Sequence, residues 1–290
     1  MINPASKLAQ AFWERGRLPD CPVFNFHAHM HDAAGLYMPR SRPEDMLRSM
    51  DAANCLISFF CSHPAMLNPT LGPEQDMAVV RRWPGRFKAY HAVVSRHLDA
   101  DADLRRVAAH PDVFVGFKFH GDWYETPITD PRHQPYWEYA DEHGLLVLCH
   151  TWGTSANDGP DQAAAILGRY RNLVFIGAHG FHDAWPKAAE IANAFPNYYF
   201  DLTGIIDDRG PLDRFLADAR GGSRQVLFGT DLPWFSLHHG IGGVLAADMT
   251  DEDRRNIFYR NGARLLGRFD WFRKLWAAQP ADGGVIPLAC

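Results

Sequence analysis

Short apolar runs rich in valine, isoleucine and phenylalanine recur along the whole chain. Runs of this length that are bounded by turn residues are typical of buried strands in a parallel sheet. We therefore predict eight strands, at residues 23–26, 55–60, 88–94, 113–119, 145–149, 173–178, 198–201 and 225–229.

Segments with helical periodicity and helix-start signals separate these runs. The stretch SRPEDMLRSMDAAN begins with Ser41 and has Pro43 and two acidic residues in its first turn, which is typical of a helix N-terminus. The same features recur in GPEQDMAVVRRWPG, NDGPDQAAAILGRYRN, DAWPKAAEIANAFPN and GPLDRFLADARGG. Strands that alternate with helices favour parallel pairing through crossover connections.

Eight strand–helix units in a chain of this length predict an α/β fold, the (β/α)8 TIM barrel. We expect a single domain over residues 1–290, with the barrel core at about 20–267 and an extra helix at each end. An open doubly wound sheet is the alternative. No GxGxxG motif follows the first strand, which argues against a dinucleotide-binding form of that fold.

Composition and charge narrow the function. The chain has 290 residues, of which 47% are hydrophobic, and a formal net charge of −5. Basic and acidic residues are interspersed and no long apolar stretch occurs, so we expect neither nucleic-acid binding nor a membrane span. The N-terminal stretch lacks the apolar core of a signal peptide, and the five scattered cysteines are typical of free thiols. We expect a cytoplasmic protein with a small-molecule substrate, and a homodimer is compatible with this.

Residues that bind metals or transfer protons occur where the predicted strands end. In an α/β barrel the carboxyl ends of the strands carry the active site. His27 and His29 end the first strand. Lys118 and His120 end strand 4. Strands 5, 6 and 8 end with His150, His179 and Asp231, respectively. Their matching positions predict that they converge on one rim.

His27 and His29 share one face of a strand, so they can bind one ion together. With His150 and Asp231 they would supply three nitrogens and one oxygen and leave room for water, as in hydrolytic zinc sites. We predict one divalent metal ion at these four residues; Zn²⁺ is the first choice, and Mn²⁺, Co²⁺ or Fe²⁺ suit the same ligands. His179 and Asp231 are the predicted catalytic residues, because an imidazole and a carboxylate can transfer protons.

The ordered motifs resemble those of the amidohydrolase superfamily, in the branch that contains aminocarboxymuconate-semialdehyde decarboxylase. The matching pieces are HAH at 27–29, VGFKFH at 115–120, the histidine at 150, GAHG at 177–180, FGTDLPW at 228–234 and the closing segment DRRNIFYRNGARLLG. The resemblance covers roughly residues 20–267. It implies a TIM barrel with one metal bound by the same four residues and a catalytic role for the histidine of GAHG.

Two positions bear on how far the family pattern applies. The family often has an aspartate two residues before the first histidine, whereas this chain has Asn25, which can orient a neighbour through hydrogen bonds but adds no charge. In binuclear relatives a lysine on strand 4 is carbamylated and bridges two metals, whereas in this branch it usually stays a lysine. We therefore expect one metal and an unmodified Lys118.

The predicted substrate-binding residues lie on the same rim. Lys118 and His120 share a strand face, Trp152 follows strand 5, and Arg40 lies in the loop after strand 1, where it could bind a substrate carboxylate. Structural alternatives are an ion pair for Lys118, loop packing for Trp152 and a solvated helix start for Arg40. Asp231 could instead cap a following helix, although its place after a buried strand favours the metal ligand.

The other histidines are expected outside the metal site. His31 should lie in the loop beyond strand 1, and His91 should be a hydrogen-bonded core residue. Surface or loop positions are expected for His63, His97, His110, His133 and His143.

The ligand set suits both hydrolysis and nonoxidative decarboxylation. A metal-activated water could attack an amide, ester or lactone, or the same centre could promote protonation of a ring or alkene carbon with release of CO₂. A glutamate in place of His27 would favour decarboxylation, and it is absent. We expect a metal-dependent hydrolase of a small, carboxylated or cyclic substrate. A decarboxylase of an unsaturated or aromatic carboxylate is the second choice, and a non-catalytic metal-binding barrel is the third.

Overall fold

Parallel strands form the centre of the molecule. The computed structural model describes residues 5–32, 37–207 and 210–278. Within these residues the strands form one eight-stranded sheet, in which each strand pairs with the next along the chain. The strands are β1 (Val23–Ala28), β2 (Cys55–Phe60), β3 (Phe87–Ala92), β4 (Phe114–Phe119), β5 (Leu146–Trp152), β6 (Val174–His182), β7 (Tyr198–Asp201) and β8 (Val226–Leu227).

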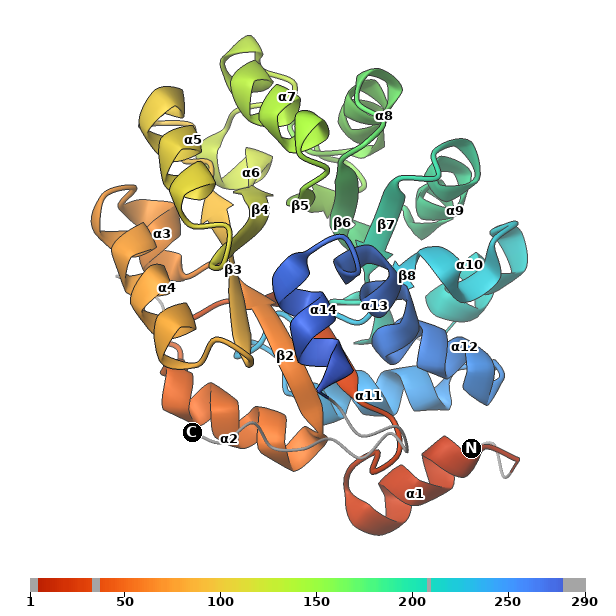
Figure 1. The fold of residues 1–290 in the computed structure, drawn as a ribbon. Coiled ribbons are helices and arrows are strands. Elements are labelled where there is room, and N and C mark those ends of the chain that lie inside the picture. Colours follow the sequence, from red (N-terminus) through yellow and green to blue (C-terminus); the bar gives the residue numbers. More distant parts are fainter. Residues whose placement is uncertain (1–4, 33–36, 208–209, 279–290) are drawn as a thin grey trace.

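The segment from β8 onward lies beside β1, and this contact closes the barrel. The backbone N–H of Phe26 donates to the carbonyl of Phe228 at 2.8 Å, and that of His29 donates to the carbonyl of Leu232 at 2.6 Å. Ala28 and Leu232 also form a parallel bridge. The predicted (β/α)8 barrel is therefore confirmed, and the doubly wound alternative is wrong (Figure 1).

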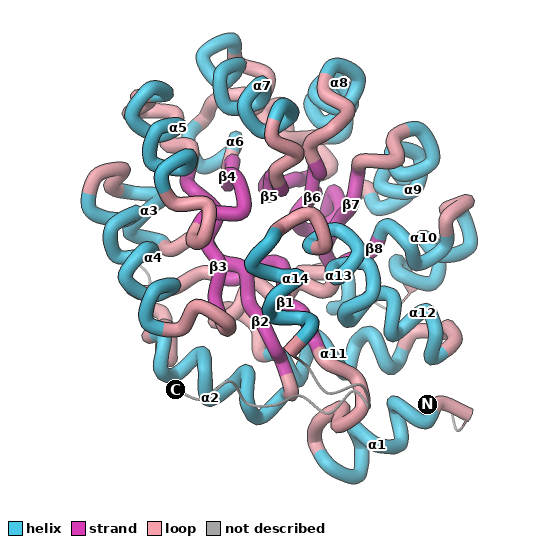
Figure 2. Tube along the Cα trace, viewed as in Figure 1, coloured by secondary structure: helices cyan, strands magenta, loops and turns pink. Residues whose placement is uncertain are grey.

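Helices surround the strands, as Figure 2 shows. The helices up to strand β3 are α1 (Lys7–Arg15), α2 (Pro43–Ala53), α3 (His63–Leu67) and α4 (Leu71–Arg82). The middle of the chain forms α5 (Ala100–Ala109), α6 (Gly121–Tyr124), α7 (Gln134–Glu142), α8 (Pro160–Arg169) and α9 (Trp185–Ala194). The later helices are α10 (Pro211–Asp218), α11 (Leu237–Ala246), α12 (Asp251–Arg255), α13 (Asn261–Leu266) and α14 (Asp270–Ala277). Short 3₁₀ helices lie at Pro131–His133, Ile205–Asp207 and Gly222–Gln225, and a π-helical turn lies at Asn256–Arg260.

Aromatic side chains pack between the strands and the helices around them. Trp137 of α7 stacks on Phe119 of β4, with ring centres 4.3 Å apart and planes 8° apart, and it lies parallel to Phe175 of β6. All three side chains are buried. Cys149 of β5 belongs to the same buried cluster. It therefore faces away from the barrel axis, as its position next to His150 predicts.

The sequence-based expectations about cysteines and membranes can be compared with the structure. Cys21, Cys55, Cys61 and Cys149 are buried free thiols. Cys290 lies outside the described residues. No helix in the described part of the chain is long and apolar enough to cross a membrane.

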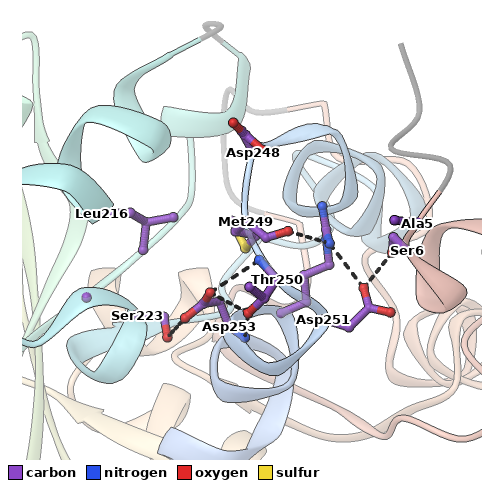
Figure 3. A pocket seen from close by; sticks show the side chains of 11 residues that line it. Ala5, Ser6, Leu216, Ser223, Asp248, Met249, Thr250, Asp251 and Asp253 are labelled. Atoms are coloured by element: carbon purple, nitrogen blue, oxygen red, sulfur yellow. Dashed lines mark hydrogen bonds and ion pairs between the residues drawn. The ribbon is translucent and has the colours of Figure 1, made fainter.

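The extra helices at each end of the barrel are confirmed, and both are attached to it. In Figure 1, α14 lies across the barrel, where Phe272 and Trp276 pack against Phe24 of β1 with ring centres 5.9 and 5.6 Å apart. At the other end of the chain, Ser6 caps α1, and its hydroxyl donates to Asp251 of α12 at 2.5 Å. Figure 3 shows this link at one side of the recess near the two helices.

Gly116 of β4 provides a test of the strand packing. A Cβ at this position, where φ is 153°, would lie 1.7 Å from the carbonyl oxygen of its paired residue Leu146 in β5. Gly116→Ala should lower the melting temperature strongly or abolish folding, because close-packed backbone cannot move aside. Gly168→Ala is the control. It adds a Cβ with no atom within 4 Å in helix α8, so it should stabilise by about 0.5–1 kcal/mol. Thermal denaturation followed by circular dichroism measures both, and a wild-type melting temperature for Gly116→Ala would contradict this packing.

Candidate metal centre

The end of β1 brings two histidines into the barrel. His27 and His29 are buried, and their ring centres lie 5.3 Å apart with planes 67° apart. Because the planes cross, the in-plane lone pairs of both rings can point to a common atom. Asn25 fixes this end of the strand: its amide donates to the Ser58 hydroxyl at 3.1 Å and accepts from the backbone N–H of Thr230 at 3.1 Å. The neutral Asn25 thus links β1 to β2 on one side and to the segment after β8 on the other.

Each of the two histidines is oriented through its Nδ1 atom. His27 Nδ1 lies 2.9 Å from a carboxylate oxygen of Asp201, and His29 Nδ1 lies 2.8 Å from the carbonyl oxygen of Cys61. Both partners are acceptors, so each Nδ1 carries the proton and each Nε2 presents a lone pair. Burial lowers the pKa of His29 to about 4, which keeps this ring neutral at pH 7. A carboxylate or carbonyl behind a histidine in this way is typical of metal ligands.

Asp231 faces both lone pairs. Its Oδ1 lies 3.1 Å from His29 Nε2 and 3.4 Å from His27 Nε2, and it is buried without a hydrogen-bond partner among the described residues. Three acceptors therefore face one another, and a cation would stabilise them. We call His27, His29 and Asp231 the ligand trio. Asp231 is not a helix cap, since Ser236 caps α11.

His150 does not join this group. The ligand atoms of the trio lie within 4.8 Å of one another, whereas His150 forms a second such group with His120 and Asp158. The rings of His150 and His120 stack with centres 3.9 Å apart and planes 12° apart. In-plane lone pairs of parallel rings do not meet at one point, so these two rings could bind one ion only if one of them turned. A role for His150 as a fourth ligand beside the trio stays a prediction.

His179 lies between the trio and His150. Its ring centre is 5.2 Å from that of His27 and 4.8 Å from that of His150. Burial lowers the pKa of His179 to about 4, so the ring is neutral at pH 7. The backbone φ is 65° at His179, 58° at Phe181 and 57° at Asp231. Left-handed conformations at non-glycine residues cost free energy and cluster at functional sites.

Asp201, at the end of β7, is a site residue that the sequence analysis missed. Its side chain is fully buried. One carboxylate oxygen accepts from His27 Nδ1, and the other accepts from the backbone N–H groups of His179 and Thr203 at 3.3 and 2.9 Å. Burial acts to raise the pKa of Asp201, but the His27 ring lowers it overall. The available signal was its position directly after an apolar strand, where strand-end residues face the same rim.

Two of the histidines expected at the surface or in loops are buried, so that prediction was wrong for His63 and His133. His63 begins α3 directly after β2, and its ring stacks on His29 with centres 4.9 Å apart and planes 23° apart. His133 lies 2.9 Å from the Ser95 hydroxyl through Nε2. Both segments fold back against the barrel, which local sequence does not indicate. His91 is a buried, hydrogen-bonded core residue, as predicted.

The predicted substrate residues are not all brought together. Lys118 is buried with Nζ 3.4 Å from His27 Nε2, and burial lowers the pKa of its amino group. Trp152 lies parallel to His150, with ring centres 5.8 Å apart and planes 5° apart. Arg40 is exposed, and among the described residues it makes no hydrogen bond or ion pair with the trio. The centre is thus lined by one amino group and flat rings.

A family model described as amidohydrolase matches residues 25–268. The chain belongs to the amidohydrolase family. The resemblance drawn from the motifs is therefore confirmed. Members of this amidohydrolase family bind a divalent metal, and the His and Asp groups described above could hold one. No curated protein matches the chain.

Solved structures share the barrel of this amidohydrolase. An uncharacterised TIM-barrel protein from Bordetella bronchiseptica is 17% identical with a TM-score of 0.71, and the match covers 85% of this chain and 99% of that chain. A dihydroxybenzoic acid decarboxylase from Polaromonas sp., with bound manganese and an inhibitor, is 17% identical with a TM-score of 0.61 and coverage of 85% and 97%. A probable 2-pyrone-4,6-dicarboxylic acid hydrolase from Acinetobacter baumannii is 14% identical with a TM-score of 0.63 and coverage of 86% and 99%. The same barrel thus occurs in a decarboxylase and in a hydrolase.

The carboxylate behind His27 provides a test of the centre. Asp201→Asn keeps the size of the side chain but removes the charge that fixes the Nδ1 proton of His27. Metal affinity, measured by competition with a chelator, should fall about 10–100-fold. Asp270→Asn changes a carboxylate of α14 that is 82% exposed and should bind as wild type. Equal affinity in the two variants would show that Asp201 does not support the ligand.

Proposed function

We propose that this amidohydrolase is a metal-dependent hydrolase of a small, carboxylated or cyclic substrate. The observation that carries the proposal is the convergence of the ligand trio, two imidazole nitrogens and a carboxylate oxygen that all lie within 4.8 Å of one another. Zn²⁺ is the ion we expect, and Mn²⁺, Co²⁺ or Fe²⁺ suit the same ligands. His150 would become the fourth ligand by turning its ring away from His120.

The residues around the trio supply proton transfer. When bound, the ion would lower the pKa of a water molecule and polarise a substrate oxygen. The carboxylate of Asp231 is ionised, and its second oxygen can accept a proton from the attacking water. His179, which is neutral and close to His27, can take up this proton and release one to the leaving group, so that both groups return to their starting state.

Substrate binding is assigned to the β4–β5 side of the barrel. The buried amino group of Lys118 suits a carboxylate, and His120 and Trp152 are proposed to line the substrate as members of a stack of parallel rings. Arg40, which is exposed in the segment between β1 and α2, is proposed as a ligand for a substrate carboxylate. A small, planar acid would match these groups in both charge and shape.

Decarboxylation is the second candidate, and the wall of parallel rings favours it. His120, His150, Trp152 and His182 stack in succession, with planes 12°, 5° and 11° apart. Such a wall suits an aromatic carboxylate. In that reaction the bond from the ring carbon to the carboxylate breaks, CO₂ leaves, and a proton delivered through His179 takes its place on the carbon.

Isotope labelling separates the two reactions. Lactones, amides, and aromatic or unsaturated carboxylates are incubated with the metal-loaded protein in ¹⁸O-water, and CO₂ is measured. Hydrolysis predicts label in a product carboxylate without CO₂. Release of CO₂ without label in the product would overturn hydrolysis in favour of decarboxylation.

Metal analysis tests the trio independently of turnover. The purified protein should contain one divalent ion per chain, because the trio forms a single cluster of acceptors. His27→Ala and Asp231→Ala should each lose it. Stoichiometric metal in both variants would eliminate this site.

His179 should affect the chemistry more than the metal. His179→Ala should keep the bound metal and lower turnover on the order of 10²-fold or more, the usual effect of a positioned acid–base group. His143→Ala, which removes an exposed imidazole, is the control for turnover and metal content. Wild-type turnover in His179→Ala would reject the assignment.

A further inference from the structure

Two histidines outside the ligand trio border the centre from different parts of the barrel. His63 follows β2 and stacks on His29 of the trio. His120 follows β4 and stacks on His150, which in turn packs against His179. In each of the two rings Nδ1 contacts the main chain, but Nδ1 of His63 donates a hydrogen bond whereas Nδ1 of His120 accepts one. The backbone therefore determines which hydrogen bond each ring can offer to a bound molecule.

His63 is fixed as an acceptor. Its Nδ1 lies 3.1 Å from the carbonyl oxygen of His31, and a carbonyl can only accept, so Nδ1 carries the proton. In the neutral ring Nε2 then presents a lone pair, and no described residue donates a hydrogen bond to it. The ring lies between the face of His29 and the edge of Trp234, whose ring centre is 6.2 Å away. With 2% of the residue exposed, the ring has little room to turn.

His120 is fixed as a donor. Its Nδ1 accepts from the backbone N–H of Trp123 at 3.2 Å, so in the neutral ring the proton is on Nε2. A carboxylate oxygen of Asp158 lies within 4.8 Å of a ring nitrogen of His120. In this structure the ring of His120 stacks on that of His150.

We propose that His63 and His120 recognise the substrate through hydrogen bonds of opposite sense. His63 accepts from a hydroxyl or amino group of the substrate, and His120 donates to its carboxylate or carbonyl oxygen. The substrate class is therefore a small hydroxy or amino acid of planar shape, and this rests on the proposed function because His63 stacks on His29 of the trio and His120 on the proposed fourth ligand His150. A site built to hydrogen-bond a substrate group discriminates against an analogue that lacks it, since its own polar atom is left unpaired.

The tautomers can be observed without any substrate. Long-range ¹H–¹⁵N spectra of the zinc-loaded protein, labelled on histidine, distinguish a protonated Nδ1 from a protonated Nε2. The signals are assigned by their loss in His63→Phe and His120→Phe, which keep a flat ring in each stack. We expect Nδ1–H for His63 and Nε2–H for His120. The opposite tautomer in either ring would overturn the proposal.

Binding of simple acids tests the recognition itself. The probes are 3- and 4-hydroxybenzoate and their methoxy counterparts, with affinities measured by calorimetry. Wild type should prefer one hydroxy acid over its methoxy counterpart by about 2–10-fold, the effect of one hydrogen bond. His63→Phe should lose this preference, and His120→Phe should bind all four acids about 2–10-fold more weakly. His143→Phe is the control and should behave as wild type.

The outcomes of this experiment are separable from those of the proposed function. Selective binding that depends on the two rings, in a protein that neither hydrolyses nor decarboxylates its ligands, would support the recognition and reject the reaction. A preference that survives in His63→Phe would overturn the proposal. Unchanged affinity in His120→Phe, or no binding of any of the four acids by wild type, would also overturn it.

Discussion

The contact between β1 and the segment that follows β8 is the constraint on which both the barrel and the metal centre depend. β8 itself spans only Val226–Leu227, so much of the closure comes from backbone and side chains beyond it. The carbonyl of His27 accepts from the backbone N–H of Asp231 at 2.9 Å, and Asn25 accepts from Thr230. The hydrogen bonds that close the barrel therefore also set the spacing of the ligand trio. A shift of one residue in the pairing between β1 and this segment would therefore both separate the metal ligands and open the barrel.

The charges of the buried groups then determine what the centre can bind. Desolvation keeps His29 and His179 neutral, while Asp231 and Asp201 stay ionised inside the protein. Lone pairs and carboxylates in such proximity repel one another, and the amino group of Lys118, 3.4 Å from His27 Nε2, offsets part of this repulsion. A divalent cation would relieve that repulsion, so binding of the ion and stability of the folded state are linked. The left-handed backbone at His179 and Asp231 indicates that the fold tolerates further strain here to place the side chains.

The sequence was sufficient to predict the barrel, because strands that are buried on both faces have a simple sequence pattern. Parallel strands become continuous apolar runs, and each predicted run became a strand of the barrel. Strand-end position likewise brought His27, His29 and Asp231 together. It could not assign Asp201, because a carboxylate that supports a ligand looks in sequence like any polar residue after a strand. Nor could it place His63, which is held by hydrogen bonds to the carbonyl groups of Met30 and His31, directly after β1.

The ring orientation of His150 was also beyond the sequence, since it depends on stacking against His120 from the neighbouring strand. Periodicity gives the face of a strand from which a side chain projects, but not the torsion of the ring. In His27, His29 and His63 the protonated nitrogen is determined by a main-chain or carboxylate partner that is distant in sequence. These partners are visible only in three dimensions.

The packing of α14 against Phe24 has a consequence for the order of events during synthesis. β1 emerges first, but its neighbour on one side comes from β8, and its aromatic side chain is covered by a helix more than 240 residues later. Before those segments leave the ribosome, His27 and His29 belong to a strand that is paired on one side at most. The ligand trio can therefore form only after the segment that follows β8 has been synthesised and has paired with β1.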